Sequence, residues 1–361
     1  MASPSSSFTI LGAGLMGRLL AVSLAQAGHA VEIFDAHGPE ADGAAARVAA
    51  AMLAPLAESA VTEPSVVRMG HYALARWPQI IAGLEQHVFF QQNGTLVLWH
   101  RQDAAEAARF AGVLAHTRQA VPELPAPRPL DAPALAQAEP TVAGRFAQGL
   151  YLPGEGQLDN RQLLAALLAA MERLGVRMHW HSPRALGAPC DQGRWLIDSR
   201  GLGARPEWGA LRGIRGEVVR VHAPDVALAR PTRLVHPRYP IYIAPKEDHL
   251  FVVGATEIES DDMSPASVRS ALELLSALYA VHPGFAEARI LEIATQCRPT
   301  LPDNLPAIRR LGPRTLQVNG LYRHGYMVSP AVLDATLELI ATGASPLAER
   351  LALRVEAGAG Q

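Results

Sequence analysis

Near the start of the chain stands Phe8-Thr9-Ile10-Leu11-Gly12-Ala13-Gly14-Leu15-Met16-Gly17, a β-rich run that leads into a Gly-x-Gly-x-x-Gly motif. A helical pattern continues to Ala27, where Gly28 provides a cap, and Ala30 to Phe34 resembles a second strand. In such a unit the first glycine allows a tight turn, the second lets the backbone approach a pyrophosphate, and the third lets helix and strand pack closely. The helix N-terminus adds unpaired N–H groups and a positive dipole end. The motif therefore predicts a dinucleotide-binding βαβ unit.

Asp35 supports this interpretation, because it ends the second strand 23 residues after Gly12 (35 minus 12). An acidic side chain at about this distance accepts hydrogen bonds from the ribose hydroxyls of a dinucleotide. An acid also disfavours a ribose 2′-phosphate, which Arg would accommodate. The predicted dinucleotide is FAD or NAD, and the plain alternative is a tight βα turn without a ligand.

Composition limits the other possibilities. The 361 residues include 34 acidic and 32 basic side chains, a formal net charge of -2, and the basic residues are scattered rather than clustered. Binding to nucleic acid is therefore not expected, because it would need an excess or cluster of cations. The apolar content of 49% with 18% charged residues supports a large folded core, of roughly two domains at ~150 residues each.

The two cysteines, Cys190 and Cys297, match no metal spacing, so we expect neither a disulfide framework nor a metal site. Met1 to Ser7 carries no positive charge ahead of the first apolar run, which glycines interrupt, so a signal peptide is not expected. The longest uncharged apolar stretch, Leu19 to Val31, is shorter than the ~20 residues of a membrane span. We expect a cytoplasmic protein with no membrane span.

Further elements can be predicted along the first half of the chain. Apolar periodicity predicts a helix from about Ser65 to Leu84, which Pro78 should kink or interrupt. Phe89-Phe90 and Thr95 to Trp99 flank the turn dipeptide Asn93-Gly94, which is typical of a hairpin. The Pro- and Ala-rich tract from Val121 to Pro140 resembles a connection between domains.

The second half changes character. Glu217 to His222, Ile241 to Ala244 and Leu250 to Val253 are predicted to form an antiparallel meander, followed by a helix from Pro265 to Val281. The last helix is predicted to begin at Ser329-Pro330, an N-cap residue followed by the residue best tolerated at the first helical position.

Beyond the glycine motif, several stretches resemble the D-amino acid oxidase superfamily of FAD-dependent oxidoreductases, and within it the glycine oxidase branch. The Ala-rich segment Ala44 to Pro55 resembles the flavin-contacting segment of the family, and Gly149-Leu150-Tyr151-Leu152-Pro153 through Arg161 resembles the stretch before its middle helix. Three further matches are Ile241 to Pro245 with Val253 to Glu257, Arg298 to Pro306, and the C-terminal flavin loop Gly320 to Tyr326.

The chain departs from the family at two places. Relatives commonly have Ser and a second Gly in the Ala-rich segment, where this chain has Ala44 or Ala45 and Ala51. Where they often show Gly-Ala-Trp-Ser, this chain reads Gly201-Leu202-Gly203-Ala204. These departures do not change the predicted cofactor. They do mean that the individual contacts to its phosphates and ring are not predicted from the family.

The resemblance implies an α/β fold with two domains. A discontinuous Rossmann-like FAD-binding domain is expected from residues 1–80, 144–213 and 292–361. An α+β substrate domain with a mixed or antiparallel sheet is expected from residues 81–143 and 214–291, with the active site between the two. The resemblance is also compatible with a homo-oligomer.

The resemblance further implies roles for individual residues. Arg298 is expected to pair with the carboxylate of the substrate, since a planar guanidinium can form two parallel charge-assisted bonds with it. Tyr242 is expected beside the same carboxylate, Met52 in the substrate pocket, and Arg323 in the catalytic site. Without the family pattern, Arg298 would be interpreted as an ordinary salt-bridge residue, Tyr242 as a half-buried aromatic and Met52 as a core residue.

The residues expected to contact the cofactor come from three segments. The helix after the C-terminal loop is expected to aim its N-terminus at the pyrimidine edge of the flavin. For His324 the ordinary alternative is a solvated loop histidine. The complete set is Gly12, Ala13, Gly14, Leu15, Met16, Gly17, Asp35, Ala51, Met52, His324, Gly325, Tyr326 and Met327. Cys297 occupies a position resembling the cysteine that carries covalent flavin in sarcosine oxidases, but the surrounding residues favour non-covalent FAD.

The reaction that the resemblance implies is oxidation of a small amino acid, with glycine as first choice. Hydride would pass from the α-carbon to flavin N5, oxygen would be reduced to hydrogen peroxide, and the imine would yield glyoxylate and ammonia or enter thiazole formation in thiamine biosynthesis. No side chain need act as a general base if the substrate amine is neutral.

Three alternatives stay open at this stage. The first is an oxidase or dehydrogenase for another D-amino acid or an N-methyl amino acid such as sarcosine. The second is a flavin oxidoreductase that modifies a carboxymethylaminomethyl group on tRNA, against which the near-neutral charge counts. The third is an NAD-binding protein without flavin, which would be colourless when purified.

Overall fold

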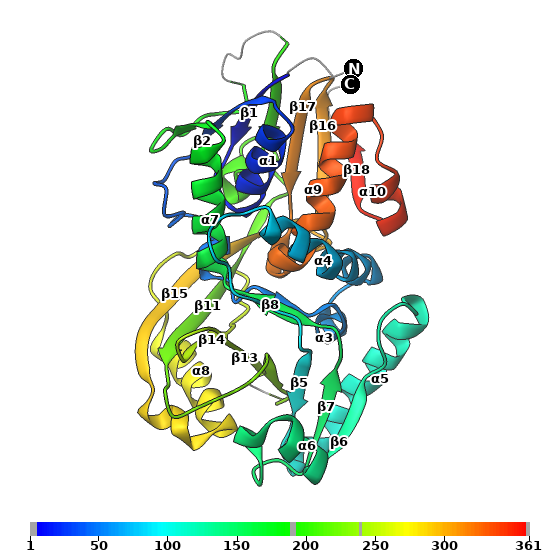
Figure 1. Cartoon of the computed structure of the whole chain (residues 1–361), viewed down its shortest axis with the longest axis vertical. Coiled ribbons are helices and arrows are strands. Elements are labelled where there is room, and N and C mark those ends of the chain that lie inside the picture. The colour runs from blue at the N-terminus through cyan, green and yellow to red at the C-terminus, as the bar shows by residue number, and fades with distance from the viewer. Residues whose placement is uncertain (1–5, 188–192, 238–239, 359–361) are drawn as a thin grey trace.

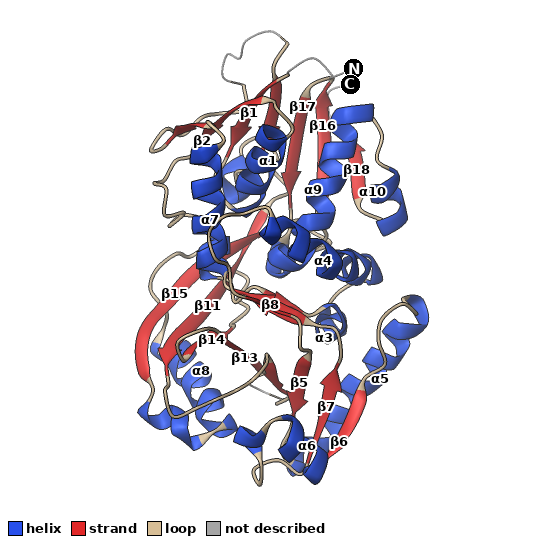
Figure 2. Cartoon of the chain, in the orientation of Figure 1, coloured by secondary structure: helices blue, strands red, loops and turns tan. Residues whose placement is uncertain are grey.

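The computed structural model describes residues 6–187, 193–237 and 240–358, and within them two large sheets form two lobes of the molecule (Figure 1). The chain passes between the lobes several times, so each lobe is assembled from segments distant in sequence. Figure 2 shows helices on the faces of the upper sheet and along the outside of the lower one.

The glycine motif belongs to a seven-stranded sheet. β1 (Ser7–Leu11) is an interior strand and pairs in parallel with β2 (Ala30–Phe34) and β10 (Trp195–Asp198), which places the turn into α1 (Leu15–Gln26) at the carboxyl edge of the sheet. The strand order is β18 (Arg354–Ala357), β16 (Ala307–Gly312), β17 (Thr315–Asn319), β10 (Trp195–Asp198), β1, β2 (Ala30–Phe34) and β9 (Arg177–His179). Only β16 and β17 pair antiparallel in this sheet as described.

Helices α1 (Leu15–Gln26), α7 (Asn160–Arg173) and α9 (Gly325–Thr342) cover this sheet together with α4 (Pro64–Ala82) and α10 (Pro346–Leu351). Their apolar faces and the central strands form the largest core, in which Phe8, Ile10, Leu20 and Trp77 are fully buried. Burial of large side chains of this kind is the main source of folding free energy, at roughly 25 cal/mol for each Å² of apolar surface.

The second sheet has eight strands and is mixed. Its order is β15 (Arg289–Thr300), β11 (Arg212–His222), β14 (Leu250–Gly254), β13 (Ile241–Pro245), β12 (Thr232–Leu234), β5 (Thr95–Leu98), β7 (Gln148–Leu152) and β6 (Arg128–Asp131). Only the β12 and β5 pair is parallel. Helix α8 (Val268–Val281) packs on one face, and α5 (Ala104–Ala120) and α6 (Ala132–Ala138) lie near the other end.

A small three-stranded sheet and two short helices connect the lobes. β3 (Met52–Leu53) and β4 (Phe90–Gln91) pair with opposite sides of β8 (Gly156–Leu158). α2 (Ala45–Val48) and α3 (Pro55–Glu58) flank β3, so the Ala-rich segment runs directly through the junction.

The predicted α/β class with a Rossmann-like unit and a second mixed sheet is confirmed. The proposed domain boundaries stay a prediction. β7 and β15 fall mostly inside segments assigned to the FAD-binding domain, yet both hydrogen-bond within the eight-stranded sheet. A division by sheets would therefore move residues 148–152 and 292–300 to the substrate domain.

The predicted hairpin around Asn93-Gly94 is wrong. β4 pairs with β8, whereas β5 pairs with β7 and β12. Gly94 does turn the chain, with φ +84°, but its N–H donates to the carbonyl of Glu155, and a Cβ there would lie 2.3 Å from the Tyr151 ring. The chain does turn at Gly94 as predicted, but the strands on either side of the turn pair with strands distant in sequence. The Val121 to Pro140 tract is likewise more than a connection, because it contains β6 and α6.

Two prolines that were expected to interrupt or begin a helix lie inside helices instead. α4 continues through Pro78, and α9 begins at Gly325, four residues before the predicted Ser329-Pro330 start. Pro330 has no N–H for the carbonyl of Tyr326, one turn earlier, but this carbonyl accepts a hydrogen bond from the Trp77 indole N–H at 2.9 Å. A tertiary hydrogen bond thus satisfies the carbonyl that the proline leaves without its helical partner, and the sequence pattern alone does not reveal this contact.

Candidate functional site

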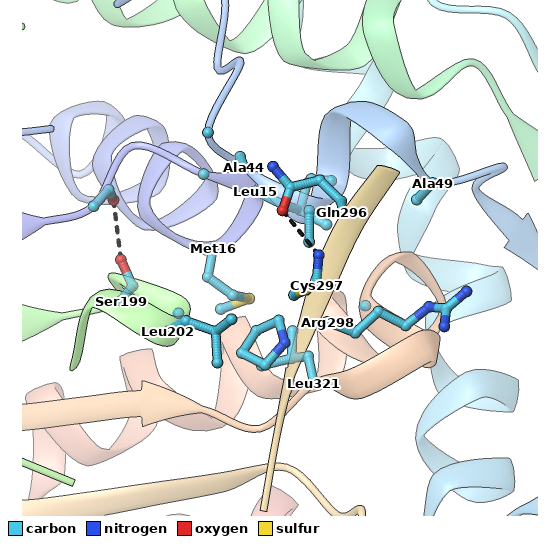
Figure 3. Close-up of a pocket in the computed structure, with 18 of the residues that line it drawn as sticks. Leu15, Met16, Ala44, Ala49, Ser199, Leu202, Gln296, Cys297, Arg298 and Leu321 are labelled. Atoms are coloured by element: carbon cyan, nitrogen blue, oxygen red, sulfur yellow. Dashed lines mark hydrogen bonds between the residues drawn. The ribbon is translucent and has the colours of Figure 1, made fainter. Parts of the chain in front are cut away.

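A cavity of about 710 Å³ lies where the two large sheets meet. Its walls come from the β1 to α1 turn, the Ala-rich segment, the 199–207 loop, β11, β13, β15 and the loop into α9. Figure 3 shows Leu15, Met16, Leu202, Leu321 and Arg298 around one part of it. A second cavity of about 510 Å³ is lined by residues of the seven-stranded lobe alone, between Arg310 and Ala357. The first cavity combines charged residues from both sheets, so we treat it as the candidate active site.

The glycine turn shapes one end of the cavity. Gly12 has φ +90°, and a Cβ on it would lie 2.7 Å from the Arg200 backbone. A Cβ on Gly17 would lie 1.8 Å from the carbonyl oxygen of Gly12, so this glycine lets α1 pack on β1. A Cβ on Gly14 would have ordinary contact with Ala44 at 3.6 Å. The protein itself thus requires Gly12 and Gly17, whereas Gly14 keeps space open in the cavity.

The N-terminus of α1 faces this space. Gly14 is its N-cap and provides no side-chain hydrogen bond, so the first-turn N–H groups lack a side-chain acceptor. Of the predicted motif residues, Gly12, Gly14, Leu15 and Met16 line the cavity, whereas Ala13 and Gly17 do not. Ala13 instead donates its N–H to Asp35 Oδ2 at 2.5 Å, and Asp35 itself lines the cavity.

The Ala-rich segment forms the next wall, and other elements hold its main chain in place. Asn160 Nδ2 donates to the carbonyls of Ala46 and Arg47 at 2.9 and 2.7 Å, and the Tyr326 hydroxyl donates to Ala46 at 3.0 Å. Ala51 has φ +53°, a conformation that favours glycine. The predicted residues Ala51 and Met52 both line the cavity.

Lys246 fixes the same segment, and sequence analysis did not single it out. It is buried at the end of β13, and its ammonium donates to the carbonyls of Ala50 and Leu158 and to Gln157 Oε1, at 2.9, 2.7 and 3.1 Å. Burial lowers the pKa of Lys246 to about 7. A sequence signal did exist, because Lys246 is the single lysine of the chain.

Arg298 and Tyr242 lie at the other end of the cavity, as the family pattern predicts for a carboxylate site. Arg298 Nη1 and Nη2 both donate to the carbonyl of Thr256 at 3.2 Å, and among the described residues no carboxylate lies within ion-pair distance. The absence of a side chain at Gly216 makes room for this guanidinium, since a Cβ there would lie 2.3 Å from Nη2. Figure 3 shows the guanidinium extending away from Cys297 and Met16.

Electrostatics at this end favour an anionic ligand. Burial lowers the pKa of Arg298 and raises the pKa of Tyr242, so the cation and the neutral phenol are each held without full solvation. A guanidinium that keeps most of its donors unused and a phenol that can donate without adding charge are together suited to one carboxylate.

Arg323, in contrast, is fully paired. Its Nε lies 3.0 Å from Glu58 Oε2, and its Nη1 lies 2.6 Å from Glu257 Oε2. Glu58 also pairs with Arg233 at 3.1 Å, and the Tyr322 hydroxyl donates to Glu257. Sequence analysis named Arg323 but missed Glu58.

Burial alone would raise the pKa of Glu58, but Arg323 and Arg233 offset this and lower it to about 2. Glu58 is therefore a carboxylate at any working pH. A signal for it was present in the sequence, since an acid closes the short Pro55–Glu58 helix directly after the Ala-rich segment. Nothing in the sequence, however, showed that Arg323 and Arg233 would meet it.

His324 is buried in the cavity wall, which excludes the solvated alternative. Its Nδ1 lies 3.7 Å from Glu58 Oε2, and its Nε2 has no hydrogen-bond partner within the described part of the chain. Burial lowers the pKa of His324 to about 4, so the ring is neutral near pH 7. Gly325, Tyr326 and Met327, predicted to lie in the C-terminal loop, are the first residues of α9, and they also line the cavity.

The two cysteines differ in what the structure describes. Cys297 is buried on β15 with its Sγ 3.6 Å from the Ser260 carbonyl and 3.8 Å from the Asp262 carbonyl. Burial raises the pKa of this thiol, which therefore stays protonated. Cys190 lies outside the described residues.

Among the residues described, no group of three His, Cys, Asp or Glu side chains is arranged to hold a metal ion, and no helix is long and apolar enough to cross a membrane.

The parallel βαβ unit and the open helix N-terminus beside it are features of a dinucleotide-dependent oxidoreductase. Comparison with known proteins agrees. Residues 7–338 match the family model of FAD dependent oxidoreductases, DAO. The chain is 41% identical over 325 residues to a Rhizobium etli protein named as the thiamine biosynthesis oxidoreductase ThiO, covering 89% of this chain and 92% of the relative.

Solved structures show the same fold. Iminodiacetate oxidase from Chelativorans sp. BNC1 superposes with a TM-score of 0.79 at 22% identity over 96% of this chain and 99% of its own. Glycine oxidase from Geobacillus kaustophilus gives a TM-score of 0.77 at 21% identity over 93% and 95%. The chain belongs to the DAO family of FAD-dependent oxidoreductases and is an enzyme of the amino acid oxidase type, as its sequence motifs predicted.

Proposed function

We propose that this enzyme oxidises a small α-amino acid, with glycine as the first candidate, and that it releases hydrogen peroxide and supplies thiazole formation in thiamine biosynthesis. The observation that carries the proposal is Arg298, a half-buried guanidinium with no carboxylate partner among the described residues, beside Tyr242. Similarity to the Rhizobium etli ThiO supports the thiamine role.

The residues present fit FAD. The space beside Gly14, the uncapped N-terminus of α1 and the carboxylate of Asp35 suit the pyrophosphate and ribose, and the unpartnered Nε2 of His324 suits a polar ligand atom at the other end. FAD supplies a two-electron acceptor for the α-carbon hydrogen of the substrate. We further propose that the FAD is non-covalent, because the Cys297 thiol is protonated and directed at main-chain carbonyls.

The chain's own contribution would be orientation and charge. Arg298 and Tyr242 would hold the substrate carboxylate and so fix the α-carbon. His324, neutral near pH 7, adds no competing positive charge beside the substrate amine. The apolar side chains Met52 and Leu321 in the wall would exclude water.

The test is anaerobic bleaching of the flavin near 450 nm by glycine, sarcosine and D-alanine, followed by air and a peroxide assay. Rapid bleaching by glycine with peroxide on reoxidation is expected. Arg298→Ala should stay yellow while its glycine KM rises by about two orders of magnitude or more. The matched control is Arg109→Ala, at an exposed position whose ion pair with Glu106 lies outside the cavity. Unchanged glycine kinetics in Arg298→Ala would remove Arg298 from the site.

A separate experiment tests how the flavin is attached. Acid precipitation should release the flavin into the supernatant, and flavin retained on the protein pellet would show covalent attachment.

A further inference from the structure

The carboxylate end of the cavity contains two guanidiniums, Arg298 and Arg323, but they differ in how they are used. Arg298 donates only to one main-chain carbonyl, that of Thr256, which leaves most of its donors available. Arg323 is bound on two sides by Glu58 and Glu257. The two cations are also close enough for Arg323 to contribute to the lowered pKa of Arg298.

Charge counting over this cluster leaves one positive charge. Arg298, Arg323 and Arg233 carry three positive charges. Glu58 and Glu257 carry two negative charges. His324 adds none near pH 7 because burial lowers its pKa to about 4. A ligand with a single carboxylate neutralises this end of the cavity, whereas a second carboxylate would meet Glu58 and Glu257 instead of a free guanidinium.

We propose that Glu58 is a specificity-determining residue that limits the site to monocarboxylate ligands by occupying Arg323. The proposal rests on the proposed function, because it takes Arg298 as the carboxylate anchor. It predicts that glycine-like and N-alkylglycine-like substrates are accepted while amino dicarboxylates, including those with two carboxymethyl arms on one nitrogen, are rejected. Rejection would arise from like charge and from unpaired desolvated oxygens rather than from size.

The position of Glu58 supports such a role. It ends α3, directly after β3, and is buried between Arg323 of the C-terminal loop and Arg233 of β12. The N-terminus of α3 is itself fixed, because Glu155 accepts the N–H groups of Leu56 and Ala57 at 2.8 Å each. Glu58 is thus held in one place by three separate elements. If it moved away to admit a second carboxylate, Arg233 would lose its carboxylate partner and Arg323 would keep only Glu257.

The experiment uses the holoenzyme and two ligands that lack an amine and so are not turned over. Methoxyacetate carries one carboxylate, and diglycolate is its counterpart with a second carboxylate. Binding is measured by the change in the absorbance spectrum of the oxidised flavin on titration. The wild-type enzyme is expected to bind methoxyacetate at least about tenfold more tightly than diglycolate.

Glu58→Gln should remove one of the two carboxylates that neutralise Arg323 and shift this preference toward diglycolate by at least about tenfold. The double variant Glu58→Gln with Arg323→Gln should lose the gain. Glu292→Gln, which breaks an ion pair with Arg161 outside the cavity, is the matched control and should keep the wild-type preference. Should Glu58→Gln fail to retain flavin, Glu257→Gln tests the same partner from its more exposed side and should shift the preference in the same direction.

The outcomes separate the two proposals. If both ligands bind the wild-type enzyme equally well, or if neither glutamate variant changes their ratio, the role of Glu58 is overturned while the carboxylate site at Arg298 stands. If neither ligand perturbs the flavin in any variant, the carboxylate site itself is wrong, and the proposed function falls together with this inference.

Discussion

Glu58 combines burial with two cationic partners, and its protonation is therefore coupled to folding. In the folded protein its pKa is about 2, whereas an ordinary glutamate in the unfolded chain titrates at about 4.5. A lowered folded-state pKa means that the stabilisation is fully present above the unfolded value and is lost as pH falls through 4.5 toward 2. The full effect is about 3 kcal/mol.

We expect the difference in melting temperature between the wild-type protein and Glu58→Gln to be large at pH 7 and to shrink progressively below pH 4.5. His324, whose pKa burial also lowers, is present in both proteins. Glu123→Gln, at an exposed position, is the control and should follow the wild-type curve at every pH. A wild-type advantage that stays constant down to pH 2.5 would contradict the ion-pair assignment.

At the scale of single elements, the turn from β1 into α1 separates two kinds of glycine. Gly17 is required by the packing of α1 on β1, and Gly14 is adjacent to open cavity. This difference is not visible in the Gly-x-Gly-x-x-Gly pattern, in which all three glycines count equally.

Gly14→Val should therefore fold but fail to bind FAD, because its side chain would occupy the space into which the first-turn N–H groups point. Gly17→Val should destabilise the fold itself, since its Cβ would meet the Gly12 carbonyl oxygen. Melting of the flavin-free forms provides the measurement. Gly14→Val should melt close to the wild-type apoprotein, and Gly17→Val at least several degrees lower. A Gly14→Val protein purified with full FAD occupancy would refute the placement of the cofactor.

Elements with strong local signals could be predicted from the sequence, and those decided by tertiary contacts could not. β1, α1 and β2 lie within one or two residues of their predicted positions. β11, β13 and β14 are antiparallel as predicted, but they do not form a simple meander, because β11 pairs with β14 and not with β13. The prediction of a hairpin at Asn93-Gly94 was wrong because its two strands pair with β8 and β7 and not with each other. The start of α9 failed because the Trp77 indole replaces the hydrogen bond that Pro330 removes.

The same distinction applies to the site. Arg298 and Tyr242 carried a family signature, and the cavity contains both. Glu58 and Lys246 had no such signature, because their significance arises from partners more than 80 residues away in sequence. A single sequence can suggest which residue types suit a carboxylate, but not which cations are already neutralised.

Over the whole molecule, the ammonium of Lys246 ties the eight-stranded sheet to the segments that connect the lobes. It extends from the β13 to β14 hairpin of the eight-stranded sheet to the carbonyls of Ala50 and Leu158, beside the cavity. Three N–H donors in tetrahedral arrangement match three neutral acceptors here, a geometry that a planar guanidinium does not reproduce.

Lys246→Met should leave both lobes folded but loosen the Ala44 to Pro55 segment. We expect FAD affinity to fall by about tenfold and amide exchange to rise in peptides from this segment. Lys246→Arg should restore little of either. Unchanged FAD affinity and exchange in Lys246→Met would show that the segment is held by Asn160 and Tyr326 alone.

The burial of this single lysine has a practical consequence. An amine-reactive label meets no lysine on the surface of the folded enzyme, only the terminal amino group of the chain, while 31 of its 32 basic side chains are arginine. Slow acylation at Lys246 would then report how often the contact between β13 and the Ala44 to Pro55 segment opens. The enzyme thus contains a site-specific probe of this contact, and no engineered cysteine is needed.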